Sequence, residues 1–274
     1  ISACLVGSEM CIRDSNYIEG LFLSSGVVRN PDYNMERLVR VAKDLRLVHR
    51  FNGYIHLKSI PGASRELVNE AGLYADRLSV NVEIPKEENL KLLAPEKDHK
   101  SVFAPMKYIQ QGVLESKEER QKFRHAPRFA PAGQSTQMIV GATSESDKDI
   151  LFLSSALYGR PTMKRVYYSG FIPVNAYDNR LPALTTPPLV RENRLYQADW
   201  LLRFYQFKVD EIVNDAYPDL DLDVDPKLAW ALRHPEVFPV DINKADYEML
   251  LRVPGIGVKS AKIIIVSRRY ANLG

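Results

Sequence analysis

Cysteine is nearly absent from this chain of 274 residues, which contains only Cys4 and Cys11. Because both fall within the first fifteen residues, the rest of the sequence offers no thiolate for a disulfide bond or a metal. The five histidines are scattered and lack the spacing of metal ligands. Residues 16–274 are therefore predicted to hold no metal ion, and so little cysteine fits a cytoplasmic protein.

Long apolar runs are missing as well. No segment approaches the roughly 18 apolar residues that a membrane-spanning helix needs, so no contact with a membrane is expected. Neither a Gly-x4-Gly-Lys-Ser/Thr phosphate loop nor a Gly-x-Ser-x-Gly nucleophile elbow occurs. The formal net charge is only +3, so any binding of nucleic acid must depend on a local patch rather than on overall charge.

Residues 1–15 resemble translated sequencing adaptor. The run Met10–Asp14, Met-Cys-Ile-Arg-Asp, corresponds to one reading frame of an adaptor end. A weak signal peptide is the alternative, but the basic start is missing and the apolar run is too short. We exclude these residues from the fold and expect the chain to be a fragment of a longer protein, truncated at both ends.

Strand-like and helix-like patterns alternate between Tyr17 and Val174. Short apolar runs next to turn-forming residues predict strands at 20–26, 54–59, 77–83, 136–143 and 164–174. Apolar residues at helical spacing predict helices at 35–45, 64–75, 87–93, 113–123 and 146–157. Such alternation is typical of parallel strands joined by crossover helices, in either a doubly wound sheet or a barrel.

In both architectures the chemistry gathers at the carboxyl ends of the strands. The predicted ends are Ser24–Gly26, Lys58, Asn81 with Glu83, Gly141–Thr143 and Pro173–Asn175. Topology alone therefore makes these positions the candidate site.

The alternation stops after Asn175. Residues 178–191 are rich in Pro and Thr and predict a linker. Residues 195–213 follow a helical pattern, and we interpret their aromatic residues Trp200, Phe204 and Phe207 as a core stripe. The resulting domains are a barrel at 16–178, a linker with a helical extension at 179–240, and a terminal motif at 241–274.

The terminal motif is a helix–hairpin–helix. Asp241–Arg252 is the first predicted helix, with Asp241 or Asn243 as its cap, and Val258–Val266 is the second. Val253–Gly257, Val-Pro-Gly-Ile-Gly, forms the hairpin between them. The leucines before the hairpin are expected to pack on apolar residues of the second helix, namely Leu250 and Leu251 on Ala261, Ile264 and Ile265.

The hairpin has the chemistry of a phosphate-binding element. Gly255 and Gly257 allow backbone N–H groups to approach a phosphate closely. Lys259 and Lys262 add positive charge beside that helix end. Such contacts hold a DNA backbone without reading its sequence. A purely structural helical hairpin is the alternative, and the complete arrangement favours DNA binding over it.

Four longer segments resemble one family of radical S-adenosylmethionine proteins. They are Gly20–Arg29, His56–Ser64, Leu78–Glu83 and Phe129–Ala142. Members of this family are described as DNA modification or repair proteins, encoded beside a uracil-DNA-glycosylase-like partner. The resemblance extends over nearly all of Asn16–Gly274, including the hairpin. It implies an α/β fold: a partial (β/α) barrel of the radical SAM type, followed by a C-terminal helical region that holds the helix–hairpin–helix.

The resemblance also implies cofactors and site residues. Ser24, Ser25 and Gly26 match the turn that receives the amino group of S-adenosylmethionine. Asn81 and Glu83 match positions that bind its ribose or methionine end, and Gly141 matches the strand that flanks adenine. The family's Cys-x3-Cys-x2-Cys loop, which ligates a [4Fe–4S] cluster, is missing before Asn16, and Cys4 and Cys11 are too few and wrongly spaced to replace it.

Three functional hypotheses remain at this point. The first is a radical SAM enzyme of DNA modification or repair, which cleaves S-adenosylmethionine to a 5′-deoxyadenosyl radical, represented here by an inactive fragment. The second is a non-catalytic barrel that binds DNA through the hairpin and recruits a glycosylase-like repair partner. The third is a metal-independent barrel enzyme for small substrates, in which the hairpin is structural.

Overall fold

The computed structural model describes residues 18–172, 180–182 and 186–274. The strands are β1 Gly20–Leu23, β2 Tyr54–Lys58, β3 Arg77–Ser79, β4 Gln134–Val140 and β5 Met163–Gly170. The helices between and just after them are α2 Pro31–Leu47, α3 Arg65–Tyr74, α4 Glu87–Leu93, α5 His99–Lys122 and α6 Asp147–Tyr158. The adaptor-like residues 1–15, the predicted strand end at 173–175 and part of the predicted linker lie outside the described residues.

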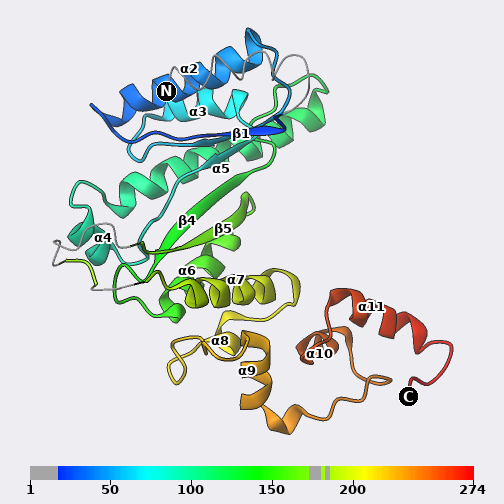
Figure 1. Cartoon of the computed structure of the whole chain (residues 1–274). Coiled ribbons are helices and arrows are strands. Elements are labelled where there is room, and N and C mark those ends of the chain that lie inside the picture. Colours follow the sequence, from blue (N-terminus) through cyan, green and yellow to red (C-terminus); the bar gives the residue numbers. More distant parts are fainter. Residues whose placement is uncertain (1–17, 173–179, 183–185) are drawn as a thin grey trace. The chain divides into compact units, whose positions relative to one another are not determined.

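The five strands form one sheet in the order β1-β2-β3-β4-β5 (Figure 1). The strands from β1 to β4 pair in parallel, with Leu57 of β2 beside both Leu23 and Leu78. The parallel α/β fold is thus confirmed. A doubly wound sheet reverses its strand order at a switch point, whereas this order is sequential. The winding is therefore that of a partial (β/α) barrel.

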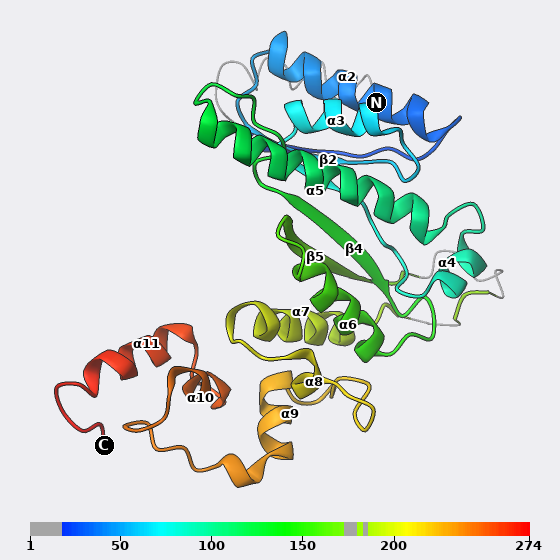
Figure 2. The ribbon, with the colours of Figure 1, turned by 180° about the vertical axis from the view of Figure 1, so that it is seen from behind.

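One face of the sheet carries the core. Successive residues of a strand point to opposite faces, and in β2 the fully buried Ile55 and Leu57 alternate with Tyr54, His56 and Lys58, which are not buried. On the core side, α3 packs against both α2 and α5, and the three helices lie side by side in Figure 2.

Helix α2 begins four residues earlier than the sequence pattern predicted. Asn30 caps it, because its side chain accepts a hydrogen bond from the Tyr33 amide, and Pro31 occupies the first helical position. Proline is favoured there because its missing N–H would have no partner in the helix. These polar and cyclic residues fall outside an apolar periodicity, which explains the late predicted start.

Helix α5 is twice as long as the predicted helix at 113–123. It begins with a capping box formed by Asp98 and Ser101 and continues through Pro105. A proline inside a helix leaves the carbonyl four residues earlier without its usual donor. Here that carbonyl belongs to Ser101, and it accepts the Gly62 amide at 3.1 Å instead. The loop after β2 therefore compensates for the proline.

Phe129 explains two glycines inside helices. Glycine in a helix interior costs about 1 kcal/mol relative to alanine. A Cβ on Gly72 of α3 or Gly112 of α5 would lie 2.2 or 2.6 Å from the Phe129 ring. The ring fills the space that the two missing side chains leave. These glycines are thus required by the packing of α3, α5 and the segment before β4.

Contacts divide the described chain into two compact units. The first comprises the residues up to Met138 together with Tyr158–Tyr167, and the second comprises Ile139–Leu157 and the residues from Tyr168 onward. The second unit also contains α7 Leu189–Phe204, α8 Val209–Ile212, α9 Pro226–Arg233, the 3-10 helix η1 Pro235–Val237, α10 Tyr247–Arg252 and α11 Val258–Ser267. None of the described helices has both the length and the apolarity that crossing a bilayer requires.

The helix predicted at 195–213 is interrupted in the structure. α7 ends at Phe204, and Gln206 has a positive φ of 59° before α8 begins. The interpretation of the aromatic residues as one core stripe is wrong for two of them. Phe207 is buried against Trp230, whereas Trp200 and Phe204 are 50% and 44% exposed.

Candidate functional site

The turn that follows β1 is fixed by one buried side chain. Asn34 of α2 is 3% exposed, and its Nδ2 donates to the Ser25 hydroxyl at 3.1 Å and to the Gly26 carbonyl at 2.6 Å. Its Oδ1 accepts the Val28 amide at 3.0 Å. Because all hydrogen-bonding directions of this amide except one are used, α2 determines the conformation of the turn.

The same turn is open to a ligand. Ser24 and Gly26 are exposed, and no atom of the described residues lies within 4 Å of the place where a Cβ on Gly26 would stand. The Gly26 carbonyl accepts from both Asn34 and the Ser25 hydroxyl, so its two lone pairs are already used. The turn therefore offers open space and a fixed backbone at the carboxyl end of β1.

Asn81 and Glu83 lie beyond the carboxyl end of β3, on the same sheet edge as this turn. Glu83 has a left-handed backbone with φ of 64°, and its amide donates to the Gln137 carbonyl at 3.0 Å. Its carboxylate is 3.6 Å from the ammonium of Lys58, the last residue of β2. A non-glycine residue in this conformation stores strain, and such residues concentrate at functional sites.

The sheet face opposite the core is polar. Parallel strands are normally apolar on both faces because helices or loops cover them. Here the register places polar side chains from three strands on one face, namely His56, Lys58, Arg77, Ser79, Ser135 and Gln137. Within the first unit this face is lined by groups that can bind a polar ligand.

His56 and Arg77 give this face a defined electrostatic character. Burial and the neighbouring Arg77 lower the pKa of His56 to about 4, so the imidazole is neutral near pH 7. The ring lies edge-on to Phe22 and 3.4 Å from the Ser135 hydroxyl. The Arg77 Nε is buried, and no described residue accepts a hydrogen bond from it. A buried guanidinium nitrogen without an acceptor is suited to an anionic ligand.

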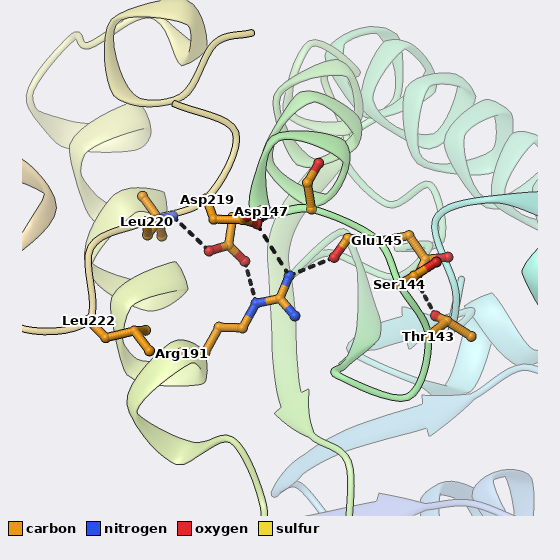
Figure 3. A pocket seen from close by; sticks show the side chains of 9 residues that line it. Thr143, Ser144, Glu145, Asp147, Arg191, Asp219, Leu220 and Leu222 are labelled. Atoms are coloured by element: carbon orange, nitrogen blue, oxygen red, sulfur yellow. Dashed lines mark hydrogen bonds and ion pairs between the residues drawn. The ribbon is translucent and has the colours of Figure 1, made fainter. Parts of the chain in front are cut away.

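Gly141, at the end of β4, belongs to the second unit. Its φ is +83°, and a Cβ at this position would approach the Pro188 ring to 2.9 Å. Both observations require glycine here, independently of any ligand. The loop that follows opens into a pocket of about 390 Å³ lined mainly by polar residues (Figure 3), which are Thr143, Ser144, Glu145, Ser146, Asp147, Arg191 and Asp219, together with Leu220 and Leu222.

The buried charge of this pocket is balanced within the pocket by an ion pair and hydrogen bonds. Asp147 is 1% exposed, and Arg191 reaches both its carboxylate, at 2.7 Å, and the Glu145 carbonyl, at 2.6 Å (Figure 3). The other Asp147 oxygen accepts the Leu220 amide at 2.9 Å. Burial raises the pKa of Asp147. Arg191 and Asp147 thus tie the loop after β4 to α7 and to the segment before α9, which is a structural role.

The hairpin lies between two short helices. Asp246 caps α10 by accepting the Met249 amide, so the predicted caps Asp241 and Asn243 are wrong, and the first helix is shorter than expected. The predicted packing is confirmed, since Leu250, Leu251 and Ala261 form a buried cluster against Ile264 and Ile265.

The backbone of the hairpin is available for binding. Gly255 has a φ of +84° and open space around it, and Gly257 caps α11 without a side chain. Within the described part of the chain, no acceptor is present for the amides of these two glycines. Lys259 and Lys262 are exposed on α11. All four predicted residues therefore lie at or near one helix N-terminus, where backbone amides and the helix dipole favour an anion.

Two side chains from the helical extension hold the hairpin. Arg252 donates to both carboxylate oxygens of Glu211 at 2.7 and 2.9 Å, and its guanidinium stacks over Phe207 and Trp230. Lys227 is 8% exposed and donates to the Ile256 carbonyl at 2.6 Å. Burial lowers the pKa of this lysine to about 8. The hairpin is thus anchored at both its start and its tip.

Comparisons with known proteins find a likeness among solved structures but none among family models or curated proteins. A search of solved structures finds coproporphyrinogen III oxidase from Escherichia coli, described as a radical SAM enzyme, with 17% identity and a TM-score of 0.43. The match covers 68% of this chain and 40% of that protein, so the chain spans about two-fifths of its length.

The predicted cofactor-binding residues fall into three groups in the structure. The turn Ser24–Gly26 lies with Asn34, and Asn81 and Glu83 lie with Gln137 and Lys58, while Gly141 is part of the second unit. The sequence prediction did not include Asn34, Arg77, Ser135, Glu211 or Lys227. Polar residues at alternate positions of β2 and β4 are the signal that could have revealed the polar face.

Proposed function

We propose that this chain belongs to a radical S-adenosylmethionine enzyme that acts on DNA. The observation that carries the proposal is the open, Asn34-braced turn after β1, at the carboxyl edge of a sequentially wound parallel sheet. In folds of this winding, ligands bind at that edge. The terminal hairpin supports DNA as the macromolecule that is bound, because its two glycine amides have no acceptor among the described residues and two lysines beside them are exposed.

The residues at the sheet edge fit the methionine end of the cofactor. Ser24 and Ser25 would offer backbone carbonyls to its ammonium group, since the Gly26 carbonyl is already engaged. Glu83 and Asn81 would accept and donate hydrogen bonds to hydroxyl or charged groups. When bound and reductively cleaved, S-adenosylmethionine supplies a radical that abstracts hydrogen from the substrate. The protein's part is to orient the cofactor and to exclude water.

The cluster does not fit the residues of this sequence. A [4Fe–4S] centre of this kind needs three cysteine thiolates, and the chain contains two, seven positions apart. Among the described residues, no group of three or more His, Cys, Asp or Glu side chains could hold a metal. We therefore derive no catalytic step for this chain and limit its proposed role to binding cofactor and DNA.

Binding of each ligand tests the proposal. We expect the full chain to bind S-adenosylmethionine in calorimetry, with at least tenfold weaker binding in Glu83→Gln and no change in Glu96→Gln, a carboxylate outside the site. We expect labelled duplex DNA to bind in fluorescence anisotropy with an affinity that falls as salt rises. Lys259→Glu combined with Lys262→Glu should abolish DNA binding while leaving cofactor binding unchanged.

The hairpin with its two exposed lysines supports a second candidate function. A barrel that binds DNA through its hairpin and brings a glycosylase-like repair partner to it would need no cluster. The same measurements separate the two proposals. DNA binding without any affinity for S-adenosylmethionine would overturn the enzyme proposal and support the alternative, and cofactor binding lost in Glu83→Gln would support the enzyme.

A further inference from the structure

Helix α7 exposes two large aromatic side chains side by side. Trp200 and Phe204 are 50% and 44% exposed, and their ring centroids are 4.4 Å apart. They are one helical turn apart, which places them on one face of the helix. Exposed apolar rings that adjoin one another commonly mark a binding surface.

The helix holds this aromatic pair in a fixed arrangement. Arg203 lies between the two in sequence, and its guanidinium is 4.7 Å from the centroid of the Phe204 ring. The same guanidinium donates to Asp199 at 2.9 Å, and that carboxylate is fully buried. Since Asp199 anchors Arg203, the guanidinium stays beside the exposed ring as one half of an ion pair. The surface therefore combines two exposed aromatic rings with a guanidinium held in place against one of them, an arrangement compatible with base stacking.

One residue, Tyr205, connects the helix that carries the pair with the hairpin. Tyr205 follows Phe204 and packs against the cluster of Leu250, Leu251 and Ala261. Its hydroxyl is 3.2 Å from the position that a Cβ on Gly257 would take. Gly257 caps α11, where the proposed phosphate contact lies. Through Tyr205, the helix that carries the exposed rings therefore contacts the hairpin that carries the glycine amides, within the second unit.

We propose that Trp200 and Phe204 stack an unpaired base of the DNA strand whose backbone the hairpin holds. The inference rests on the proposed function, because it presumes that the hairpin binds DNA. Bases inside a duplex are already stacked on one another and cannot reach such a platform. The preferred ligand is therefore single-stranded DNA, or duplex DNA with an unpaired base, with little dependence on sequence.

The experiment compares three DNA ligands on the full chain. Labelled single-stranded DNA, the fully paired duplex of the same sequence and that duplex with one unpaired base are titrated by anisotropy. The variants are Trp200→Leu and Phe204→Leu, which keep apolar bulk but remove the ring. Phe152→Leu is the matched control, because Phe152 is 42% exposed and lies beside the Lys148 ammonium in the same unit.

We expect each ring variant to weaken binding of the unpaired ligands roughly tenfold, within the range known for base stacking on aromatic side chains. Binding of the paired duplex and the thermal unfolding curve should stay unchanged, as should all properties of the control. Quenching of tryptophan fluorescence by single-stranded DNA, lost in Trp200→Leu, would support direct stacking.

Several results would overturn the inference. Equal losses for paired and unpaired ligands would show a structural effect, and unchanged binding of all three would exclude the platform while the hairpin function stands. Self-association that disappears in Trp200→Leu would assign the rings to a protein contact instead. If the unaltered chain binds none of the DNA ligands, the proposed DNA function itself fails.

Discussion

The turn after β1 and the hairpin before α11 are built alike, but different kinds of side chain hold them in place. Each presents backbone groups that a small residue leaves accessible, and each is braced by a buried side chain. The turn is braced by Asn34, which lies eight residues after Gly26. The hairpin is braced by Glu211 and Lys227, which lie 41 and 29 residues from their partners.

The comparison shows what fixes the conformation of a binding site that consists mainly of backbone groups. Glycine and serine make a turn accessible but do not fix its conformation, because they have few contacts of their own. A polar side chain with several hydrogen bonds supplies that rigidity. In the turn the brace is neutral, whereas in the hairpin it is ionic and partly buried. We therefore expect that removing such a side-chain contact lowers the free energy of unfolding more in the hairpin than in the turn.

The largest effect is expected from Arg252→Met. The change leaves the Glu211 carboxylate without its cation and removes the guanidinium from Phe207 and Trp230. Loss of one partner of a largely buried ion pair costs about 3 kcal/mol in the free energy of unfolding. Chemical denaturation measures it, with Arg269→Met, at an exposed position, as the control. An unchanged unfolding midpoint would refute the anchoring role.

A smaller loss is expected for Asn34→Ala, which removes three hydrogen bonds from the turn. Water can reach the exposed turn and replaces part of the hydrogen bonding that Asn34 provided, which reduces the loss of stability. We expect about 2 kcal/mol less stability and faster proteolytic cleavage within residues 24–28. Asn52→Ala, on an exposed loop, should change neither. If cleavage is as slow as in the unaltered chain, the turn is fixed by something other than Asn34.

The smallest effect is expected for the pH dependence of stability, which involves His56 on the polar face of the sheet. Since the folded pKa of His56 is about 4, below its ordinary value of 6.5, the folded state binds fewer protons than the unfolded chain between these values. Stability should therefore fall as pH is lowered from 7 to 5, by about 1 kcal/mol after allowance for partial exposure. His56→Gln should reduce this pH dependence, and an identical profile would contradict the assignment.

Local spacing allowed much of the fold to be predicted. The pattern of β2 and the composition of Val253–Gly257 are contained within a few neighbouring residues, and both were placed correctly. Helix α4 was predicted at its observed bounds. The first half of α5 was missed, because the carbonyl left free by Pro105 is satisfied by Gly62, which is distant in sequence. Trp200 and Phe204 were placed in the core, because helical spacing does not tell which face of a helix is buried.

The sequence by itself determined the alternation of strands and helices, the small residues at the end of β1 and the hairpin with its lysines, since each depends on residues close together in the chain. Only the tertiary structure decided that His56, Arg77 and Ser135 share one polar face, and that Glu211 and Lys227 hold the hairpin. The physical reason is that strand register and side-chain contacts across long separations arise from packing, which no local pattern encodes.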